Sequence, residues 1–534
     1  MKKIQYLIII SILINTGVGC KKWLDVNTDP ANVQVPSARV LLSPILYQMA
    51  NNVAIDSRGF NKYVQYWHSQ AANDTWDMQG YTSASDFGGS LWRMVYVNHG
   101  PNLNDLIKDG ETSGNYIYAG IGYAIKAWGF QLLTDYHGPV ILDEAFTPNQ
   151  LTFHYQDQPE VYVKVREWAH MAIENLNKPD VIDQAAFLQG ASGDQIYKGD
   201  RDKWKKFVYG LLALQFSHLT NKPEYPTAYA DSVIKYTDLS FASTADDASV
   251  FFNGSNADDS NVFGPKQNLI TATAYGRISQ TVIDLLSGKM RGDTARVDTL
   301  KNNATALTTS NDPRLFRMMI PNPDSTYKGI VPTRGDVPTT KTRPHVWGGI
   351  IGTYPGRYIF TDNARFPIMT YSQLQFAKSE AQLIKGDRTG AHASYLNGIK
   401  GHMAFVNNYL GFGTETLPAI TQTQINSYLL SADVAQSSAE LRISDIMGQK
   451  FIAQFAWGGL ETWVDLRKYH YDTTVFKSFH YPEQGEIYIL NRNKLVYRVR
   501  PRYNSEYVWN KVELEKWGGL NTDYHTEELW FSKP

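Results

Sequence analysis

A single cysteine, Cys20, is present among the 534 residues, so the chain cannot close a disulfide on itself or build a cysteine-based zinc site. An excess of either charge is also missing, because 51 basic side chains stand against 52 acidic ones. Neutralising nucleic-acid phosphates or anionic lipid requires a basic surface. The composition therefore argues against nucleic-acid binding and against polybasic membrane attachment, and the near neutrality mildly favours an uncharged ligand.

The common catalytic motifs are missing as well. The sequence has no Gly-x-Ser-x-Gly elbow, no His-Glu-x-x-His helix, no Gly-x-x-x-x-Gly-Lys phosphate loop and no Gly-x-Gly-x-x-Gly fingerprint. Its 12 histidines lack metal-ligand spacing. The acidic residues Asp258 and Asp259 lack the pattern of a calcium loop, and we interpret them as a solvated turn. We expect no cofactor, no metal and no catalytic residue.

Long apolar runs are scarce, and the one at the N-terminus is short. Lys2 and Lys3 precede an apolar segment at residues 7–14, and small residues lead to Cys20. This is the three-part pattern of a secretory signal peptide, and the run is far below the roughly 20 residues that span a bilayer. The segment ending at Cys20 is similar to a bacterial lipobox, although Gly17 stands where leucine is commoner. The alternative is an ordinary signal peptide with a coincidental cysteine.

We therefore expect three parts. Residues 1–19 form a lipoprotein signal peptide, and residues 20–36 form a polar tether that begins at an acylated, palmitate-type Cys20. Two or three acyl chains on that cysteine would anchor the protein stably. Residues 37–534 form a single domain.

Helical periodicity dominates that domain. Apolar residues recur at three- and four-residue spacing in residues 203–219, 116–134, 160–176, 374–384 and 438–469, which predicts five amphipathic helices. The second of these is rich in glycine and alanine, which allows a neighbouring helix to pack closely. Residues 242–273 and 321–365 lack periodicity, and loops of this length in a compact domain are commonly functional. Residues 486–490 and 495–500 predict a small β-hairpin.

Six stretches, taken together and in order, resemble the SusD-like (SusD/RagB) lipoproteins. They are LDVNTDP at 24–30, DYHGPV at 135–140, DQIYKGD with KWKKF at 194–207, TYSQLQFAKSEA at 370–381, ETWVDLR at 461–467, and RPRYNSE at 500–506 with Asn510. His137 departs from the family's turn. The resemblance covers essentially the whole chain after Cys20.

The resemblance implies a mainly α domain with four tetratricopeptide-like helix pairs as its scaffold. It also implies a non-catalytic protein of the outer membrane, facing the cell exterior, that binds a nutrient and acts as a lid on a SusC-like TonB-dependent transporter. We expect the motif residues to have structural roles. Glu380 should pair inside the scaffold, Asp465 and Arg467 should form ion pairs, and the Arg500-Pro501 stretch should fix the C-terminal segment to the core.

An oligosaccharide is the first expectation for the ligand. A sugar ring has an apolar face and a rim of hydroxyls, which an aromatic ring with polar neighbours can match. Three loops with that composition lie at residues 66–81, 268–277 and 345–358, while Trp67 is interpreted as core. The predicted ligand contacts are Trp76, Tyr81, Tyr275, Arg277, Trp347 and Tyr354, and exposure is expected for Trp76, Trp347 and Tyr354 because they stand among glycines and polar residues.

Three alternatives stay open at this point. A lipid-anchored glycoside hydrolase needs two carboxylates facing each other across a cleft, and 52 acidic residues leave that possibility open. A peptide-binding uptake lipoprotein would use the same scaffold. A purely structural lid would seal the transporter without any affinity for a ligand.

Overall fold

The computed structural model describes residues 36–269, 276–292, 312–322, 325–336, 346–347, 356–412 and 416–534. The helices are α2 (Ala38–Tyr63), α3 (Ser90–Arg93), α4 (Gly100–Thr112), α5 (Tyr116–His137), α6 (Gln158–Asn177), α7 (Ala185–Leu188), α8 (Arg201–Ser217), α9 (Ala230–Leu239), α10 (Gln280–Asp284), α11 (Leu315–Met318), α12 (Tyr371–Lys385), α13 (Arg388–Asn407), α14 (Gln422–Leu429), α15 (Ile443–Ala453), α16 (Gly459–Lys468) and α17 (Lys511–Lys516). The strands are β1 (Trp67–His68), β2 (Ala248–Val250), β3 (Arg277–Ile278) and β4 (Phe366–Met369). None of the helices in these ranges combines the length and the apolar character needed to cross a bilayer.

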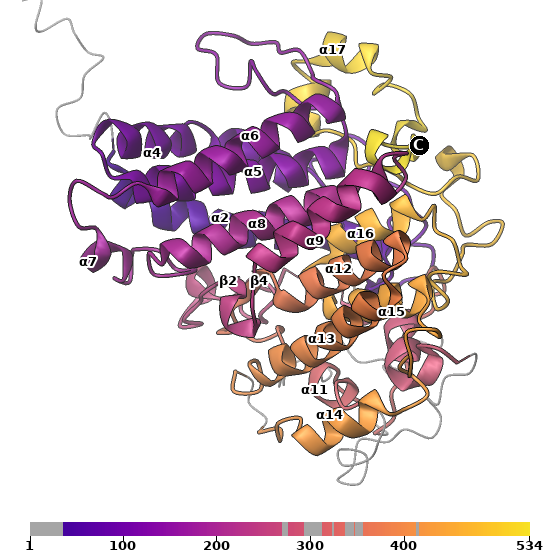
Figure 1. The fold of residues 1–534 in the computed structure, drawn as a ribbon. Helices are drawn as coiled ribbons and strands as arrows, with labels where there is room; N and C mark the ends of the chain where they lie inside the picture. The colour runs from indigo at the N-terminus through magenta and orange to yellow at the C-terminus, as the bar shows by residue number, and fades with distance from the viewer. Residues whose placement is uncertain are drawn as a thin grey trace, which may run out of the picture.

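The helices pack in pairs, α2 with α4, α5 with α6, α8 with α9 and α12 with α13. Because α4 also lies on α5, α6 on α8 and α9 on α12, the pairs form one continuous stack (Figure 1). The strands are accessory: β1 pairs with β3 and β2 with β4, each antiparallel. This arrangement confirms the predicted mainly α fold with tetratricopeptide-like pairs.

Helix α8 shows how the sequence encodes these elements. The Asp200 carboxylate accepts hydrogen bonds from the backbone amides of Asp202 and Lys203, which satisfies free N–H groups at the helix start. Trp204, Phe207 and other members of the predicted apolar stripe are fully buried. Burial of each large apolar side chain contributes roughly 1.5–3 kcal/mol. The other predicted helices at 116–134, 160–176 and 374–384 correspond to α5, α6 and α12, and Trp67 is in the core as expected.

Small residues in α5 let two neighbouring helices approach closely. A Cβ atom added to Gly120 would lie 2.6 Å from Cγ of Leu176 on α6, and one added to Gly122 would lie 2.5 Å from Cγ1 of Ile107 on α4. Contacts this short are not tolerated without movement of the neighbour. The two glycines thus set the spacing on both sides of α5.

The predicted helix at 438–469 is wrong as a single element, because the chain breaks it into α15 and α16. Ala456 in the break has a left-handed φ of 71°, and its carbonyl accepts a hydrogen bond from Nδ2 of Asn61 on α2. A Cβ on Gly459 would overlap the Asn61 side chain. Close packing against α2, rather than local preference, therefore ends one helix and starts the next.

The predicted hairpin at 486–500 is also wrong. Residues Ile489–Asn491 form a 3₁₀ turn, and the extended residues around it bond to distant segments. The amide of Tyr488 donates to the Met78 carbonyl, and the amide of Val499 donates to the Tyr136 carbonyl. The backbone amides of Tyr497 and Arg498 donate to the carbonyl of His525. The segment therefore forms backbone hydrogen bonds with three separate parts of the protein instead of with itself.

A buried network of charges joins the helix stack to α15 and α16. Glu380 on α12 lies 2.7 Å from Lys468, and Asp465 lies 2.8 Å from Lys450 and 3.1 Å from Lys468. These contacts confirm the structural roles expected for Glu380 and Asp465. The ion pair expected for Arg467 is wrong: its guanidinium donates instead to the backbone carbonyls of Trp463, Asp135 and Tyr497.

His218 completes this network. Its ring nitrogens lie 3.2 Å from a carboxylate oxygen of Asp135 and 3.0 Å from one of Glu461. Burial alone would lower the pKa of His218, but the carboxylates of Glu461 and Asp135 outweigh it and raise the pKa to about 9. The imidazole is thus a buried cation between two acids, which is a structural arrangement rather than an accessible acid–base pair.

Candidate ligand-binding site

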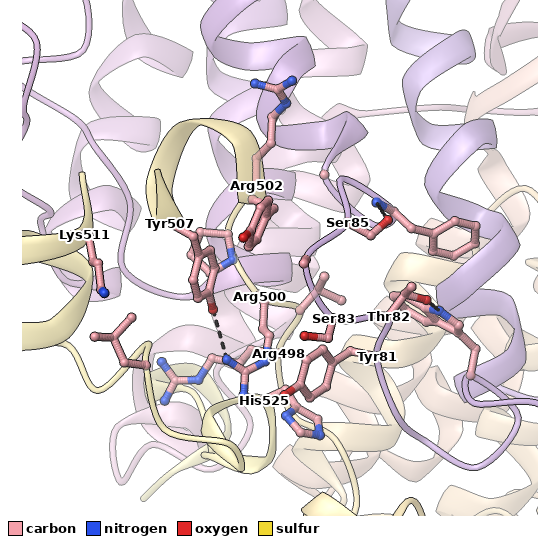
Figure 2. A pocket seen from close by; sticks show the side chains of 18 of the residues that line it. Tyr81, Thr82, Ser83, Ser85, Arg498, Arg500, Arg502, Tyr507, Lys511 and His525 are labelled. Carbon is pink, nitrogen blue, oxygen red and sulfur yellow. Dashed lines mark hydrogen bonds between the residues drawn. The ribbon is translucent and has the colours of Figure 1, made fainter. Parts of the chain in front are cut away.

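A cavity of about 300 Å³ opens between the loop at residues 81–89 and the C-terminal segment at residues 498–525. Figure 2 shows the two sides, with Thr82, Ser83 and Ser85 from the loop and the arginines, Tyr507 and Lys511 from the C-terminal segment. These segments are more than 400 positions apart in the chain and are tied together by an ion pair of 2.6 Å between Asp86 and Arg502.

Trp76 lines this cavity from the side of the 81–89 loop. Its ring stacks on Tyr63, with 5.1 Å between ring centroids, and packs against Phe87 at 4.8 Å. Its Nε1 donates to the hydroxyl of Thr82 at 3.0 Å, and the residue is only 4% exposed. The exposure expected for Trp76 is therefore wrong. Its indole instead holds the 81–89 loop in place through the contacts with Thr82 and Phe87.

Arg500 holds the two sides of the cavity together. Its guanidinium lies 4.1 Å from the ring centroid of Tyr81, a favourable cation–π distance. The same group donates to the Tyr507 hydroxyl and to the backbone carbonyls of Gly519, Asn521 and Thr522. This confirms that the Arg500-Pro501 stretch fixes the C-terminal segment, and it makes Tyr81 a half-buried part of the cavity wall.

Two tyrosines form an aromatic surface on the C-terminal side. Tyr503 and Tyr507 belong to the helical turn Tyr503–Tyr507 and stack with an interplanar angle of 17° and a centroid distance of 5.5 Å. Both are half-buried. The Tyr507 hydroxyl is held by Arg500 and Gly519, so the pair is fixed in orientation. Such a surface can receive the apolar face of a sugar ring.

His525 closes the bottom of the cavity beside Tyr81. Its Nε2 lies 2.6 Å from Oδ1 of Asn491, which assigns the N–H to Nε2 and leaves the buried Nδ1 as an acceptor with no partner among the described residues. Burial, together with the positive charges of Arg500 and Arg498, lowers the pKa of His525 to about 3. The ring is therefore neutral at physiological pH and able to accept a hydrogen bond.

Two other predicted contacts, Arg277 and Trp347, do not line this cavity. Arg277 lies on β3 and is 7% exposed, and Trp347 is 1% exposed with its Nε1 bonded to the Phe263 carbonyl at 2.6 Å. The exposure expected for Trp347 is therefore wrong. Tyr275, Tyr354 and Cys20 lie outside the described residues.

The three predicted loops do meet, however. A guanidinium nitrogen of Arg277, in the second loop, donates to Oε1 of Gln70 in the first at 3.2 Å. The amide of Val346 in the third loop donates to the carbonyl of Gly276 at 2.8 Å. The sequence therefore identified loops that assemble. Among the four predicted contacts that the structure describes, Trp76 and Tyr81 line the cavity, whereas Arg277 and Trp347 do not.

Sequence reasoning missed the C-terminal half of the cavity, above all Tyr503, Tyr507, Lys511 and His525. The RPRYNSE stretch was assigned to the fold alone. A usable signal was present, because two tyrosines four residues apart follow two arginines, and this spacing places aromatic rings side by side on a helical turn.

The chemistry of the cavity is that of a binding site. No aspartate or glutamate is among its lining residues, so the two opposed carboxylates of a glycosidase are missing from it. Within the described ranges, no group of three or more His, Cys, Asp or Glu side chains is arranged to hold a metal ion. Asp258 and Asp259 lie in the exposed turn Ala257–Asp259, as predicted.

Comparisons with known proteins agree on one family. A family model described as "Starch-binding associating with outer membrane" matches residues 30–487. No curated protein matches the sequence. Among solved structures, a SusD/RagB family protein from Bacteroides thetaiotaomicron is 21% identical with a TM-score of 0.67, covering 93% of this chain and 99% of that one. A SusD homologue from Bacteroides fragilis is 17% identical with a TM-score of 0.66, covering 93% and 100%.

A chitin-binding protein has the same fold, with 18% identity, a TM-score of 0.64 and coverage of 92% of this chain and 97% of that one. Identities this low establish the shared fold, whereas the family model spans most of the sequence. The chain therefore belongs to the SusD-like family of outer-membrane proteins, which bind nutrients and carbohydrates and are not enzymes.

Proposed function

We propose that this chain is a lipid-anchored protein of the cell surface that binds an oligosaccharide between the 81–89 loop and the C-terminal segment and delivers it to a SusC-like TonB-dependent barrel. Membership of the SusD-like family supports the nutrient-binding class. The lipobox-like sequence ending at Cys20 supports the anchor. The lid role and the outward orientation rest on the family resemblance.

The observation that carries the glycan assignment is the fixed tyrosine pair beside polar groups. The rings of Tyr503 and Tyr507 are stacked and held in place, and the hydroxyls of Ser83 and Ser85 lie across the cavity (Figure 2). A volume of about 300 Å³ is at the lower end of small-molecule sites. Aromatic surface plus a few oriented polar groups is what recognition of a sugar ring requires.

Calorimetry of a chain starting at Lys21 against soluble oligosaccharides tests this proposal, with peptides as a second panel. We expect at least one oligosaccharide to bind, and Tyr503→Ala to weaken it at least fivefold, equivalent to about 1 kcal/mol. Tyr481→Ala is the matched control, because Tyr481 is exposed and does not line the cavity. Binding of peptides without any oligosaccharide would overturn the glycan assignment.

The same experiment separates the cavity from the junction of the three loops. If Tyr275→Ala or Tyr354→Ala abolishes binding while Tyr503→Ala has no effect, the ligand lies at the junction instead. Thermal unfolding of each variant checks that affinity, rather than folding, has changed.

The partner needs a separate test. Affinity purification of the tagged chain from detergent-solubilised outer membranes should recover a TonB-dependent barrel in a constant ratio to the chain. Recovery of the chain alone, from membranes in which such a barrel is present, would contradict the proposed partner.

A further inference from the structure

The side chains that line the cavity include positively charged groups but no acidic groups. Four cationic side chains, Arg498, Arg500, Arg502 and Lys511, are among the lining residues, and no aspartate or glutamate is. The chain as a whole is nearly neutral, with a formal net charge of −1. The positive charge is therefore a local feature of this cavity and not a consequence of the composition.

Two of these four cations have acidic partners just outside the cavity. Arg498 lies 2.6 Å from Glu527, and Arg502 lies 2.6 Å from Asp86. Arg500 and Lys511 form no ion pair within the described part of the chain. The charge of Arg500 meets carbonyl dipoles, a phenol hydroxyl and the face of the Tyr81 ring but no carboxylate among the described residues, and Lys511 is exposed.

Arg500 and Lys511, which have no ion pair in the described part of the chain, differ in how their charge is held. The terminal nitrogens of Arg500 donate to protein oxygens, so its charge is fixed in position, while its Nε is buried and has no partner in the part of the chain that the structure describes. Lys511 begins helix α17 and is exposed, and its ammonium group carries three hydrogen-bond donors. The lowered pKa of His525, caused by burial and by Arg500 and Arg498, agrees with a positive potential in the cavity.

We propose that the ligand is an acidic glycan, and that its carboxylate or sulfate group lies in the part of the cavity lined by Arg500 and Lys511. This inference rests on the proposed glycan-binding function and specifies its substrate class. Arg500 supplies a fixed field, Lys511 supplies direct hydrogen bonds to the anion, and the tyrosine pair receives the apolar face of an adjoining ring. A neutral glycan would leave the two charges unused.

A matched pair of ligands tests the inference. We expect a linear oligomer of 1,4-linked α-galacturonic acid to bind at least tenfold more tightly than its carboxyl-reduced, neutral counterpart of the same length. A sulfated oligosaccharide and its desulfated form provide the second arm, which distinguishes a sulfate from a carboxylate as the recognised group. The affinity for the acidic member should fall as salt is raised from 50 to 500 mM, because partly exposed charge pairs are screened.

Reversing the charge of Lys511 tests whether this residue binds the anionic group of the ligand. Lys511→Glu should weaken binding of the acidic oligomer about tenfold and leave binding of its neutral counterpart unchanged, since it turns an attraction into a repulsion at an exposed site. Lys400→Glu is the control, because Lys400 is exposed on α13, at the far end of the stack from α17 in Figure 1, and changes the net charge equally.

The outcomes are distinguishable from those of the proposed function. If neutral oligosaccharides bind as tightly as acidic ones, or if Lys511→Glu and Lys400→Glu behave alike, the acidic-ligand inference is overturned while glycan binding stands. If no glycan of either kind binds, both proposals fall together.

Discussion

Lys468 on α16 places its Nζ 2.7 Å from Oε2 of Glu380 on α12, and both side chains are completely buried. The second carboxylate oxygen of Glu380 accepts a hydrogen bond from the Tyr469 hydroxyl at 2.6 Å. Lys468 also donates to the Ser217 carbonyl at the end of α8. One ion pair therefore connects two helix pairs of the stack to the C-terminal helices, which in turn lead to the segment that forms the cavity.

Replacing Glu380 with glutamine should lower the free energy of unfolding by about 3 kcal/mol, the lower end of the range for breaking a buried ion pair, because Lys468 keeps Asp465 at 3.1 Å as an acidic partner. The measurement is the midpoint of urea unfolding. Glu167→Gln is the control, since Glu167 pairs with Lys164 at 2.8 Å on the exposed face of α6, where such pairs contribute about 0–1 kcal/mol. Equal shifts of the unfolding midpoint in the two variants would show that the buried ion pair contributes no more to stability than the exposed one.

Stability should depend on pH through His218. Its pKa is raised to about 9 in the folded protein from the ordinary value of 6.5, so the fold favours the protonated ring. The stabilisation is fully present below pH 6.5 and is lost as pH rises through about 9, an effect of about 3 kcal/mol. Urea unfolding at pH 6.5 and 9.5 measures it. In the His218→Gln variant, most of the difference in unfolding free energy between the two pH values should disappear. If the difference is unchanged, other titrating groups cause it.

Helix α5 offers a matched pair of glycine substitutions. Alanine adds about 1 kcal/mol of helix propensity at either position. At Gly120 a new Cβ would lie 2.6 Å from Leu176, and overpacking of this kind costs about 1–3 kcal/mol. At Gly129 the nearest atom would be 3.5 Å away. Gly120→Ala should therefore lower the melting temperature and Gly129→Ala should raise it. A rise in both would contradict close packing of α5 on α6.

Local signals in the sequence were sufficient for four of the five helices that were predicted, which correspond to α5, α6, α8 and α12. In α12, the Thr370 side chain caps the helix start, and Gly386 ends the helix with a left-handed φ of 90°. The helix break at residues 454–458 was not predictable in this way. It depends on Asn61, which is 395 positions from the carbonyl that it binds, and no local pattern records such a contact.

The candidate site was predictable only in part, for the same reason. Trp76 and Tyr81 were found because aromatic residues stood out in a polar loop. Their partners, such as Arg500, come from the other end of the chain and meet them only in the folded protein. Trp347 shows the opposite error: glycines around it suggested exposure, but its indole N–H finds a carbonyl in the core, which removes the usual cost of burying that group.

The anchor assignment gives a cellular prediction. Cys20→Ala should remove the acylation site, and the protein should then be recovered in the soluble periplasmic fraction, since the apolar segment at residues 7–14 is too short to span the bilayer. Fractionation followed by immunoblotting measures this in a strain that lacks the partner barrel. A variant that still sediments with membranes in that strain would refute the lipid anchor.

Ligand affinity should be insensitive to pH between 5.5 and 8, although a histidine lines the cavity. The pKa of His525 is lowered to about 3 by burial and by Arg500 and Arg498, so the ring stays neutral across this range. An acidic sugar stays ionised there as well, because carboxyl groups of ordinary pKa near 4 have already lost their proton. Calorimetry of the bound oligosaccharide at pH 5.5, 6.5 and 8 measures the effect. Tighter binding of an acidic ligand at pH 5.5 than at pH 8 would mean that His525 gains a proton in the complex, and that the field of the two arginines is weaker than the geometry indicates.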